Sequence, residues 1–203
     1  MRIGIFGGTF DPPHLGHLIL ASESQCQLNL DRLLFVLTSS PPHKIRQSVT
    51  PIELRIRMLQ AALDDNPLFE FSRVDIDRPG PHYAVDTVNV IRSQFPGSEV
   101  IYLMGGDSLR NLPEWHKPRE LVYAVDNLGV MRRPGHRINW SNLEKNIPGI
   151  SEKVWFVDAP LLEISSSEIR KRVADHCAFR YYVPDNVYKF ITETGLYLEA
   201  MNG

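Results

Sequence analysis

The sequence predicts an α/β fold, an open parallel sheet with helices on both faces and a small helical part at the C-terminal end. Apolar strand-like runs alternate with helix-like segments through about the first 130 residues, as parallel strands with right-handed crossovers require. The run LLFVL, within residues 32–39, is continuously apolar, as in a strand buried on both faces. The first apolar run ends in Gly7 and Gly8, at a turn where such sheets commonly bind ligands.

Six strands are predicted from apolar or alternating runs bounded by turn residues. The first precedes the glycine pair, and the last follows a polar, turn-rich stretch. We expect that stretch, residues 132–149, to be an irregular surface segment. The predicted strands are residues 2–6, 32–39, 68–76, 99–105, 127–133 and 155–160.

Helices are predicted where apolar residues recur at helical spacing. The segment TPIELRIRMLQAALDDN has the clearest start signal. Thr50 stands at the N-cap position, Pro51 at the first helical position and Glu53 where it would complete a capping box. We expect the C-terminal helical part to begin at about residue 165. The predicted helices are residues 15–29, 50–66, 83–95, 165–176 and 184–195.

Composition favours one domain over residues 1–203 that acts on small molecules. The chain has 203 residues, 43% of them hydrophobic, and a net charge of -2, so it has no global cationic field for nucleic acid. The two cysteines, Cys26 and Cys177, are isolated, so neither a disulfide framework nor a zinc cluster is expected, and both are assigned to buried apolar positions. With no apolar run long enough for a leader or a membrane span, we expect a cytoplasmic protein.

The segment GGTFDPPHLGH concentrates the chemistry of the first turn. Gly7 and Gly8 let the backbone approach a ligand. His14 and His17 lie three residues apart at a helix start, hence on one face, where free N–H groups attract anions. The spacing is neither GxGxxG nor GxxxxGK[ST], so no dehydrogenase or P-loop enzyme is indicated. The residues suit a phosphate group, although packing roles for the histidines, or a metal pair with Asp11, stay open.

A second motif, LLEISSSEIRKR, predicts another anion site. A capping box of Ser165 and Glu168 accounts structurally for part of it. It leaves three further polar residues at the helix start, which would bind phosphate: Ser166, Ser167 and Arg170. Two phosphate sites on one sheet favour a nucleoside triphosphate as ligand.

These motifs resemble those of a known family. GGTFDPPHLGH matches in full the GGxFxPxHxGH signature of the nucleotidyltransferases, and ISSSEIR resembles their ISSTxIR, with Ser167 in place of threonine. Within that superfamily the chain resembles the nicotinate-mononucleotide adenylyltransferases through PPHK, HYAVDT, MGGDSLRNLPEWHKPREL and RRPG, from Met1 to about Ile191. The sequence has GGD where GAD is common, and Gly106 keeps that position small.

The resemblance implies a Rossmann-like fold and transfer of AMP from ATP to nicotinate mononucleotide, which gives deamido-NAD and pyrophosphate in NAD biosynthesis. His17 would act on the α-phosphate and His14 beside it, without a covalent intermediate or a general base. Mg²⁺ is expected to be carried with ATP, and no protein metal site is expected. Asp107 would meet the ribose, with a helix N-cap as its alternative role. The implied ATP-binding residues are Gly7, Gly8, Thr9, Phe10, His14, His17, Gly105, Asp107, Arg133, Ser166, Ser167 and Arg170.

For the acceptor, the resemblance implies that the nicotinate ring lies against Thr87 and Trp115 and that backbone N–H groups meet its carboxylate. A core position is the alternative for Trp115, and an exposed basic loop is the alternative for Arg46. The implied acceptor-binding residues are Lys44, Tyr83, Thr87, Trp115 and His116.

Three other functions compete with this one. A fragment of a class I aminoacyl-tRNA synthetase would share the HxGH turn, but the KMSKS-like loop is missing. An adenylyltransferase for phosphopantetheine or for nicotinamide mononucleotide is closer, and a nucleotide sensor without turnover belongs to another class. The sequence leaves the formation of a homo-oligomer open.

Overall fold

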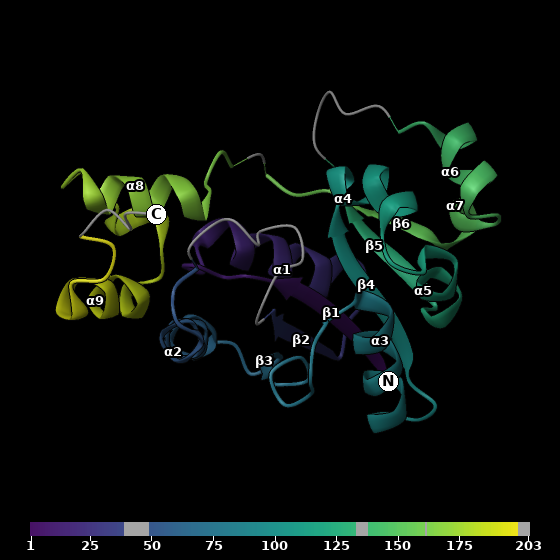
Figure 1. Cartoon of the computed structure of the whole chain (residues 1–203), viewed down its shortest axis with the longest axis horizontal. Helices are drawn as coiled ribbons and strands as arrows, with labels where there is room; N and C mark the ends of the chain where they lie inside the picture. The colour runs from purple at the N-terminus through teal and green to yellow at the C-terminus, as the bar shows by residue number, and fades with distance from the viewer. Residues whose placement is uncertain (39–48, 133–137, 161, 199–203) are drawn as a thin grey trace.

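A computed structural model describes residues 1–38, 49–132, 138–160 and 162–198, and the strands in these ranges form one sheet of six (Figure 1). Their order is β3-β2-β1-β4-β5-β6, and every neighbouring pair is parallel. This confirms the predicted open parallel sheet. The strands are β1 (Arg2–Gly8), β2 (Arg32–Leu37), β3 (Phe69–Ser72), β4 (Glu99–Gly105), β5 (Asn127–Met131) and β6 (Val154–Val157).

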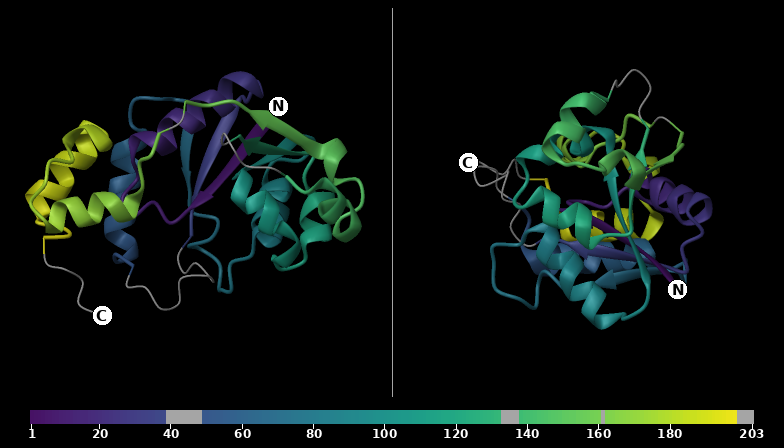
Figure 2. Two further views of the ribbon diagram at one scale, coloured as in Figure 1. Left: turned by 90° about the horizontal axis from the view of Figure 1, so that it is seen from above. Right: turned by 90° about the vertical axis from the view of Figure 1, so that its right-hand side faces the viewer.

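Helices cover both faces of the sheet (Figure 2). On one face, Ile5 and Val36 of the strands pack in a single apolar cluster with helices α3 to α7. On the other face, Phe6 and Phe35 pack with α1 and α2. The covering helices are α1 (Leu15–Gln27), α2 (Ile52–Leu63), α3 (Ala84–Gln94), α4 (Gly106–Asn111), α5 (Pro118–Ala124), α6 (Trp140–Asn146) and α7 (Ile150–Lys153).

The C-terminal helices form a third apolar cluster with α2. This part contains α8 (Ser166–Ala174), the 3-10 turn η2 (Arg180–Tyr182) and α9 (Asp185–Thr194). Met58 of α2 packs there with Ile169 of α8 and Ile191 of α9. Figure 1 shows α8 and α9 at one end of the molecule, and α6 and α7 at the opposite end.

The predicted start of α2 is wrong. The helix begins at Ile52, Pro51 is its N-cap, and no side chain caps it. Thr50 is buried, and its backbone N–H donates to a carboxylate oxygen of Asp11 at 3.1 Å. This contact holds Thr50 against the turn after β1, so the capping box with Glu53 does not form.

The stretch predicted to be irregular, residues 132–149, contains helix α6, so that prediction is also wrong. Asn139 caps this helix by accepting the N–H of Asn142 at 3.1 Å. Leu143 and Ile147 each have 2% of their surface exposed, because both pack into the core over the sheet. Their apolar spacing was the signal that the polar surroundings concealed.

Other boundaries differ from the prediction as well. Strand β3 ends at Ser72 rather than at residue 76. Helices α4 and α5, with the 3-10 turn η1 (Leu112–Glu114), fill the connection between β4 and β5, where no helix was predicted. Cys26 and Cys177 are unpaired and exposed, not buried as predicted.

Candidate active site

The turn after β1 lies at the point where the strand order reverses. Strands β2 and β3 extend the sheet on one side of β1, and β4 to β6 extend it on the other. Ligands of open α/β sheets bind at the carboxyl ends of the strands at such a switch point. We call residues 9–14, which connect β1 to α1, the first-turn loop.

Phe10 fixes the course of this loop. Its backbone is left-handed, with φ of 46°. Its ring is 2% exposed and packs against Phe6, Phe35 and His17. A Cβ on Gly8 would lie 2.8 Å from this ring, so a glycine is required there by packing inside the protein. Gly7 instead lines a cavity.

The paired histidines stand at the start of α1. His14 is the N-cap, its ring stacks on that of His17 at 3.6 Å between centroids, and its backbone N–H donates to Nδ1 of His17 at 3.2 Å. Since Nδ1 accepts, a neutral His17 carries its proton on Nε2 and is a donor there. Burial lowers the pKa of His14 to about 4 and that of His17 well below its usual value. Both rings are therefore neutral at pH 7.

Two side chains of helix α8 donate hydrogen bonds to backbone carbonyls of the first-turn loop. Ser166 donates its hydroxyl to the carbonyl of Pro12 at 2.8 Å, and the Arg170 guanidinium donates to the carbonyl of Asp11 at 2.7 Å. Sequence analysis placed both side chains on phosphate, whereas the structure also gives each a contact with the loop.

Ser165, the first serine of the second motif, caps α8. Ser165 accepts the backbone N–H of Glu168 at 3.2 Å, as predicted. Its hydroxyl lies 3.2 Å from that of Ser167. The Glu168 carboxylate instead pairs with Arg172 at 3.3 Å, so the Glu168 half of the predicted capping box does not form.

The Asp11 carboxylate is held from two sides. One oxygen accepts the hydroxyl of Tyr197 at 2.6 Å, and the other accepts the N–H of Thr50. Asp11 is 4% exposed, so its charge needs these partners. Burial and the neighbouring Asp11 carboxylate raise the pKa of the Tyr197 hydroxyl. Asp11 thus joins the loop to the C-terminal segment.

Arg55 of α2 is 1% exposed and contacts the first-turn loop. It was not among the residues predicted from the sequence. Its guanidinium donates to the carbonyls of Thr9 at 3.1 Å, Thr38 at 2.9 Å and Thr50 at 2.9 Å. The sequence did carry a signal, because Arg55 lies on the same helical stripe as the buried Met58.

A cavity of about 460 Å³ opens at the carboxyl end of β1, next to Gly7, and brings together four predicted acceptor-binding residues. The rings of Tyr83 and His116 stack at 3.9 Å, and Trp115 meets Tyr102 edge to face at 6.3 Å. A cavity of about 950 Å³ lies elsewhere, along α3, α5 and α7. Of the two cavities next to the β1–α1 connection, the one of about 460 Å³ is the larger, and we call it the large cavity. Its walls are Ile5, Gly7, Val36, Thr38, Asp75, His82, Tyr83, Ala84, Thr87, Tyr102, Glu114, Trp115 and His116.

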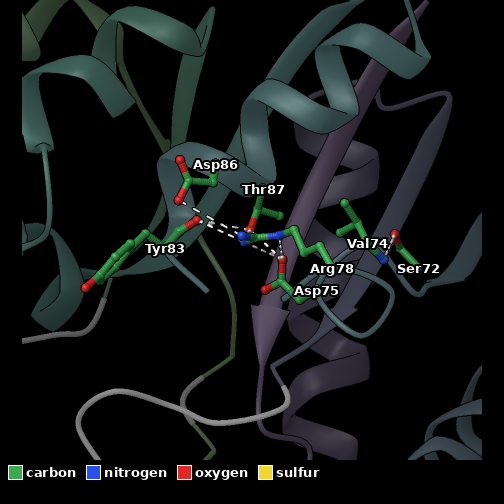
Figure 3. A network of polar contacts seen from close by, with 7 residues as sticks. All are labelled: Ser72, Val74, Asp75, Arg78, Tyr83, Asp86 and Thr87. Carbon is green, nitrogen blue, oxygen red and sulfur yellow. Dashed lines mark hydrogen bonds and ion pairs between the residues drawn. The ribbon is translucent and has the colours of Figure 1, made fainter. Parts of the chain in front are cut away.

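A polar network forms one wall of the large cavity (Figure 3). Thr87 donates its hydroxyl to Asp75 at 2.6 Å, and Arg78 donates to the same Asp75 oxygen at 3.0 Å. Arg78 also donates to the Thr87 hydroxyl at 3.0 Å. Sequence analysis missed Asp75 and Arg78. A predicted strand over residues 68–76 hid Asp75, although a carboxylate just past a strand end is a usual sign of a site.

A second cavity, of about 140 Å³, lies by the start of α1. It brings together His14 and Gly105, both predicted to bind ATP, and its wall also includes Gly16 and Met131. A Cβ on Gly16 would lie 3.0 Å from Nδ1 of His14. Asp107 is not the N-cap of α4, which is Gly105, but stands in the first helical turn and pairs with Arg110. We call this space the small cavity.

Three predicted cationic residues, Lys44, Arg46 and Arg133, lie outside the described residues. Among the residues that are described, no three His, Cys, Asp or Glu side chains gather closely enough to hold a metal ion. Within the same ranges, no helix combines the length and the hydrophobicity needed to cross a membrane.

The chain is similar to known proteins over nearly its whole length. It is 45% identical to a probable nicotinate-nucleotide adenylyltransferase of Thermomicrobium roseum, over 98% of this chain and 94% of that protein. It is 38% identical to the nicotinate-nucleotide adenylyltransferase of Bacillus subtilis, over 97% of this chain and 98% of that protein.

Solved structures share the fold. The nicotinic acid mononucleotide adenylyltransferase of Plasmodium falciparum, complexed with NaAD, matches with a TM-score of 0.79 at 19% identity over 99% of both chains. The same enzyme complexed with APC matches with a TM-score of 0.75 at 20% identity, again over 99% of both chains. The sequence model of the family described as cytidylyltransferase-like matches residues 5–172. The chain belongs to the cytidylyltransferase-like family, among its nicotinate-nucleotide adenylyltransferases.

Proposed function

We propose that this enzyme transfers AMP from ATP to nicotinate mononucleotide and releases deamido-NAD and pyrophosphate. One observation carries the proposal. The segment from the end of β1 to the start of α1 forms walls of both cavities, with Gly7 in the large one and His14 and Gly16 in the small one. Two nucleotides bound on either side of this segment would bring their phosphates together at the histidines.

The large cavity suits the acceptor. Its aromatic walls offer Trp115 and the stacked pair of Tyr83 and His116, and aromatic faces attract a pyridinium ring. Helix α3 begins at this cavity with Ala84. The first amide N–H groups of a helix have no acceptor within it and attract anions. Those of Ala84 and Val85 are our candidates for binding the nicotinate carboxylate.

The small cavity suits the adenosine side of ATP, with the phosphates running past the histidines toward α8. The acceptor phosphate would attack the α-phosphorus, forming one P–O bond while the bond to the β-phosphate oxygen breaks and pyrophosphate leaves. The acceptor phosphate is already ionised at neutral pH, so no proton has to be removed. Neutral His17 would donate from Nε2 to the α-phosphate, where negative charge grows in the transition state.

Magnesium enters this proposal as part of the ATP substrate. The carboxylate within the first-turn loop, on Asp11, is already bound by Tyr197 and Thr50. Mg²⁺ usually keeps several waters and binds substrate phosphates, so the donor set fits a metal that ATP brings. It would neutralise phosphate charge, while the residues above position the phosphates.

We also propose that residues 1–203 act as one unit in the cytoplasm. The unit is supported by the contacts of Arg170 and Tyr197 with the first-turn loop. The location is supported by two unpaired, exposed cysteines, which are typical of a reducing compartment.

Product analysis tests the proposed reaction. The enzyme is incubated with MgATP and nicotinate mononucleotide, and the products are separated by chromatography. We expect deamido-NAD and pyrophosphate in equal amounts. ATP binding without either product would favour a nucleotide sensor and contradict the proposal.

A further inference from the structure

The wall of the large cavity contains a buried carboxylate, on Asp75, that the proposed reaction does not use and that pairs with the partly buried Arg78. Asp75 has 6% of its side chain exposed and Arg78 has 18%. Asp75 lines the cavity, whereas Arg78 is not one of the lining residues. Arg78 donates to Asp75 and to the Thr87 hydroxyl (Figure 3). The pair joins the loop after β3 to the first turns of α3.

The negative charge of the Asp75 carboxylate is balanced by Arg78. The hydroxyl of Thr87 donates to the carboxylate, but it is neutral. Arg78 supplies the positive charge and also approaches Asp86 at 4.0 Å. A buried carboxylate left without its cation acts strongly on nearby charges, because the interior screens them weakly. The cavity wall already holds a second carboxylate, on Glu114.

The two candidate acceptors differ in charge at one group. Nicotinate mononucleotide carries a ring carboxylate where nicotinamide mononucleotide carries a neutral amide. An uncompensated Asp75 would repel the acid and leave the amide nearly unaffected. On the basis of the proposed function, we propose that Arg78 is a specificity-determining residue that neutralises Asp75 and so permits the acid acceptor to bind.

The role of Arg78 in acceptor choice is indirect. The N–H groups at the start of α3 contact the acceptor, and Arg78 removes a repulsion that would oppose them. Removing the arginine therefore weakens binding of the acid acceptor, while removing both charges together restores that binding. A residue that only supports the fold would affect both acceptors alike.

A charge-swap series tests this role. Values of kcat/KM are measured for both mononucleotides with the wild type, Arg78→Gln, Arg78→Lys and the double variant Asp75→Asn with Arg78→Gln. We expect Arg78→Gln to lower the acid-to-amide ratio about tenfold or more, from an unscreened like charge. Arg78→Lys should lose less, and the double variant should return to within about threefold of the wild type.

Arg73→Gln is the matched control. It breaks an exposed arginine–aspartate pair with Asp77 in the same loop, outside the cavity wall, and its ratio should equal that of the wild type. Equal losses for both acceptors in Arg78→Gln would overturn the inference. A ratio in the double variant as low as in Arg78→Gln would also overturn it, since Arg78 would then bind the acceptor directly.

Two further measurements cover a variant that does not fold or an enzyme that does not turn over. Asp75→Asn alone keeps an oxygen for Thr87 and leaves Arg78 unbalanced, so the ratio should rise, and an unchanged ratio would contradict the inference. Calorimetric titration of each mononucleotide gives the same ratios as affinities without turnover. Failure of the wild type to make deamido-NAD would contradict the proposed function alone.

Discussion

The first-turn loop and the wall of the large cavity are stabilised over very different distances along the chain. Ser166, Arg170 and Tyr197 reach the loop from 154, 159 and 186 residues away. The contacts of Asp75 with Arg78 and Thr87 span 3 and 12 residues. The proposed site of phosphate chemistry thus depends on the C-terminal segment, whereas acceptor choice, as we propose it, depends on one local loop. Substitutions on the two sides should separate turnover and ATP binding from acceptor recognition.

The largest effect is expected for His17→Ala, which tests the proposed phosphate site at the first-turn loop and the start of α1. We expect kcat to fall by about a hundredfold or more, since a transition-state donor of this kind contributes about 3 kcal/mol. ATP affinity should change little. Single-turnover rates and calorimetric titration with ATP measure the two quantities. Lost ATP affinity with an intact kcat would make His17 a ground-state ligand.

Arg170→Ala should lower the affinity for ATP by about tenfold to a hundredfold, because it removes a charged hydrogen bond that contributes about 1.5–3 kcal/mol. It also frees the Asp11 carbonyl of the first-turn loop. The affinity for nicotinate mononucleotide should stay the same. Lys171→Ala, an exposed neighbour on α8, is the control. Equal losses for both substrates would instead indicate that α8 had unfolded.

The buried histidines should make the loop side sensitive to acid. The pKa of His14 falls to about 4 in the folded state, against about 6.5 when unfolded. The folded state therefore binds fewer protons, and the stability present above pH 6.5 is lost as the pH falls toward 4. Between pH 7 and 5 we expect His14 to remove about 2 kcal/mol.

Urea unfolding of the wild type and of His14→Gln at both pH values measures this loss. The variant lacks the titrating ring, so its two free energies of unfolding should differ less than those of the wild type. The same difference in both proteins would show that His14 is not the group responsible.

Trp115→Ala tests the acceptor side with the smallest expected effect. A ring stacked on the pyridinium contributes about 1 kcal/mol, so both mononucleotides should bind about fivefold more weakly. Their ratio should stay nearly constant, because the indole does not distinguish the acid from the amide. Trp155, which packs on the other face of the sheet, provides the control variant Trp155→Ala. A changed ratio in Trp115→Ala would mean that the indole takes part in the choice of acceptor.

Sequence analysis predicted the parts of the site whose signals are local. The alternation of strand-like and helix-like segments predicted the parallel sheet. The spacing of His14 and His17 placed both on one face of α1, where their rings stack. The aromatic and polar residues around Trp115 were expected to share a pocket, and four of them line the large cavity.

The missed features depend on long-range contacts. Thr50 has the residue type of an N-cap, yet its N–H bonds to Asp11, 39 positions away. Arg55 looks like a polar interruption in an apolar helix until the carbonyls of three different segments surround it. Nothing near Tyr197 in the sequence indicates that its hydroxyl meets Asp11. Such partners are fixed only when the tertiary structure forms.

Acceptor competition tests the central claim most directly. Wild-type enzyme with saturating MgATP receives equal amounts of nicotinate and nicotinamide mononucleotide, and both dinucleotide products are quantified over time. Backbone N–H donors would leave the amide group unpaired, at a cost of about 1–3 kcal/mol. We therefore predict that deamido-NAD forms at least about fivefold faster. Equal rates for the two products would contradict the assignment of nicotinate mononucleotide as the acceptor.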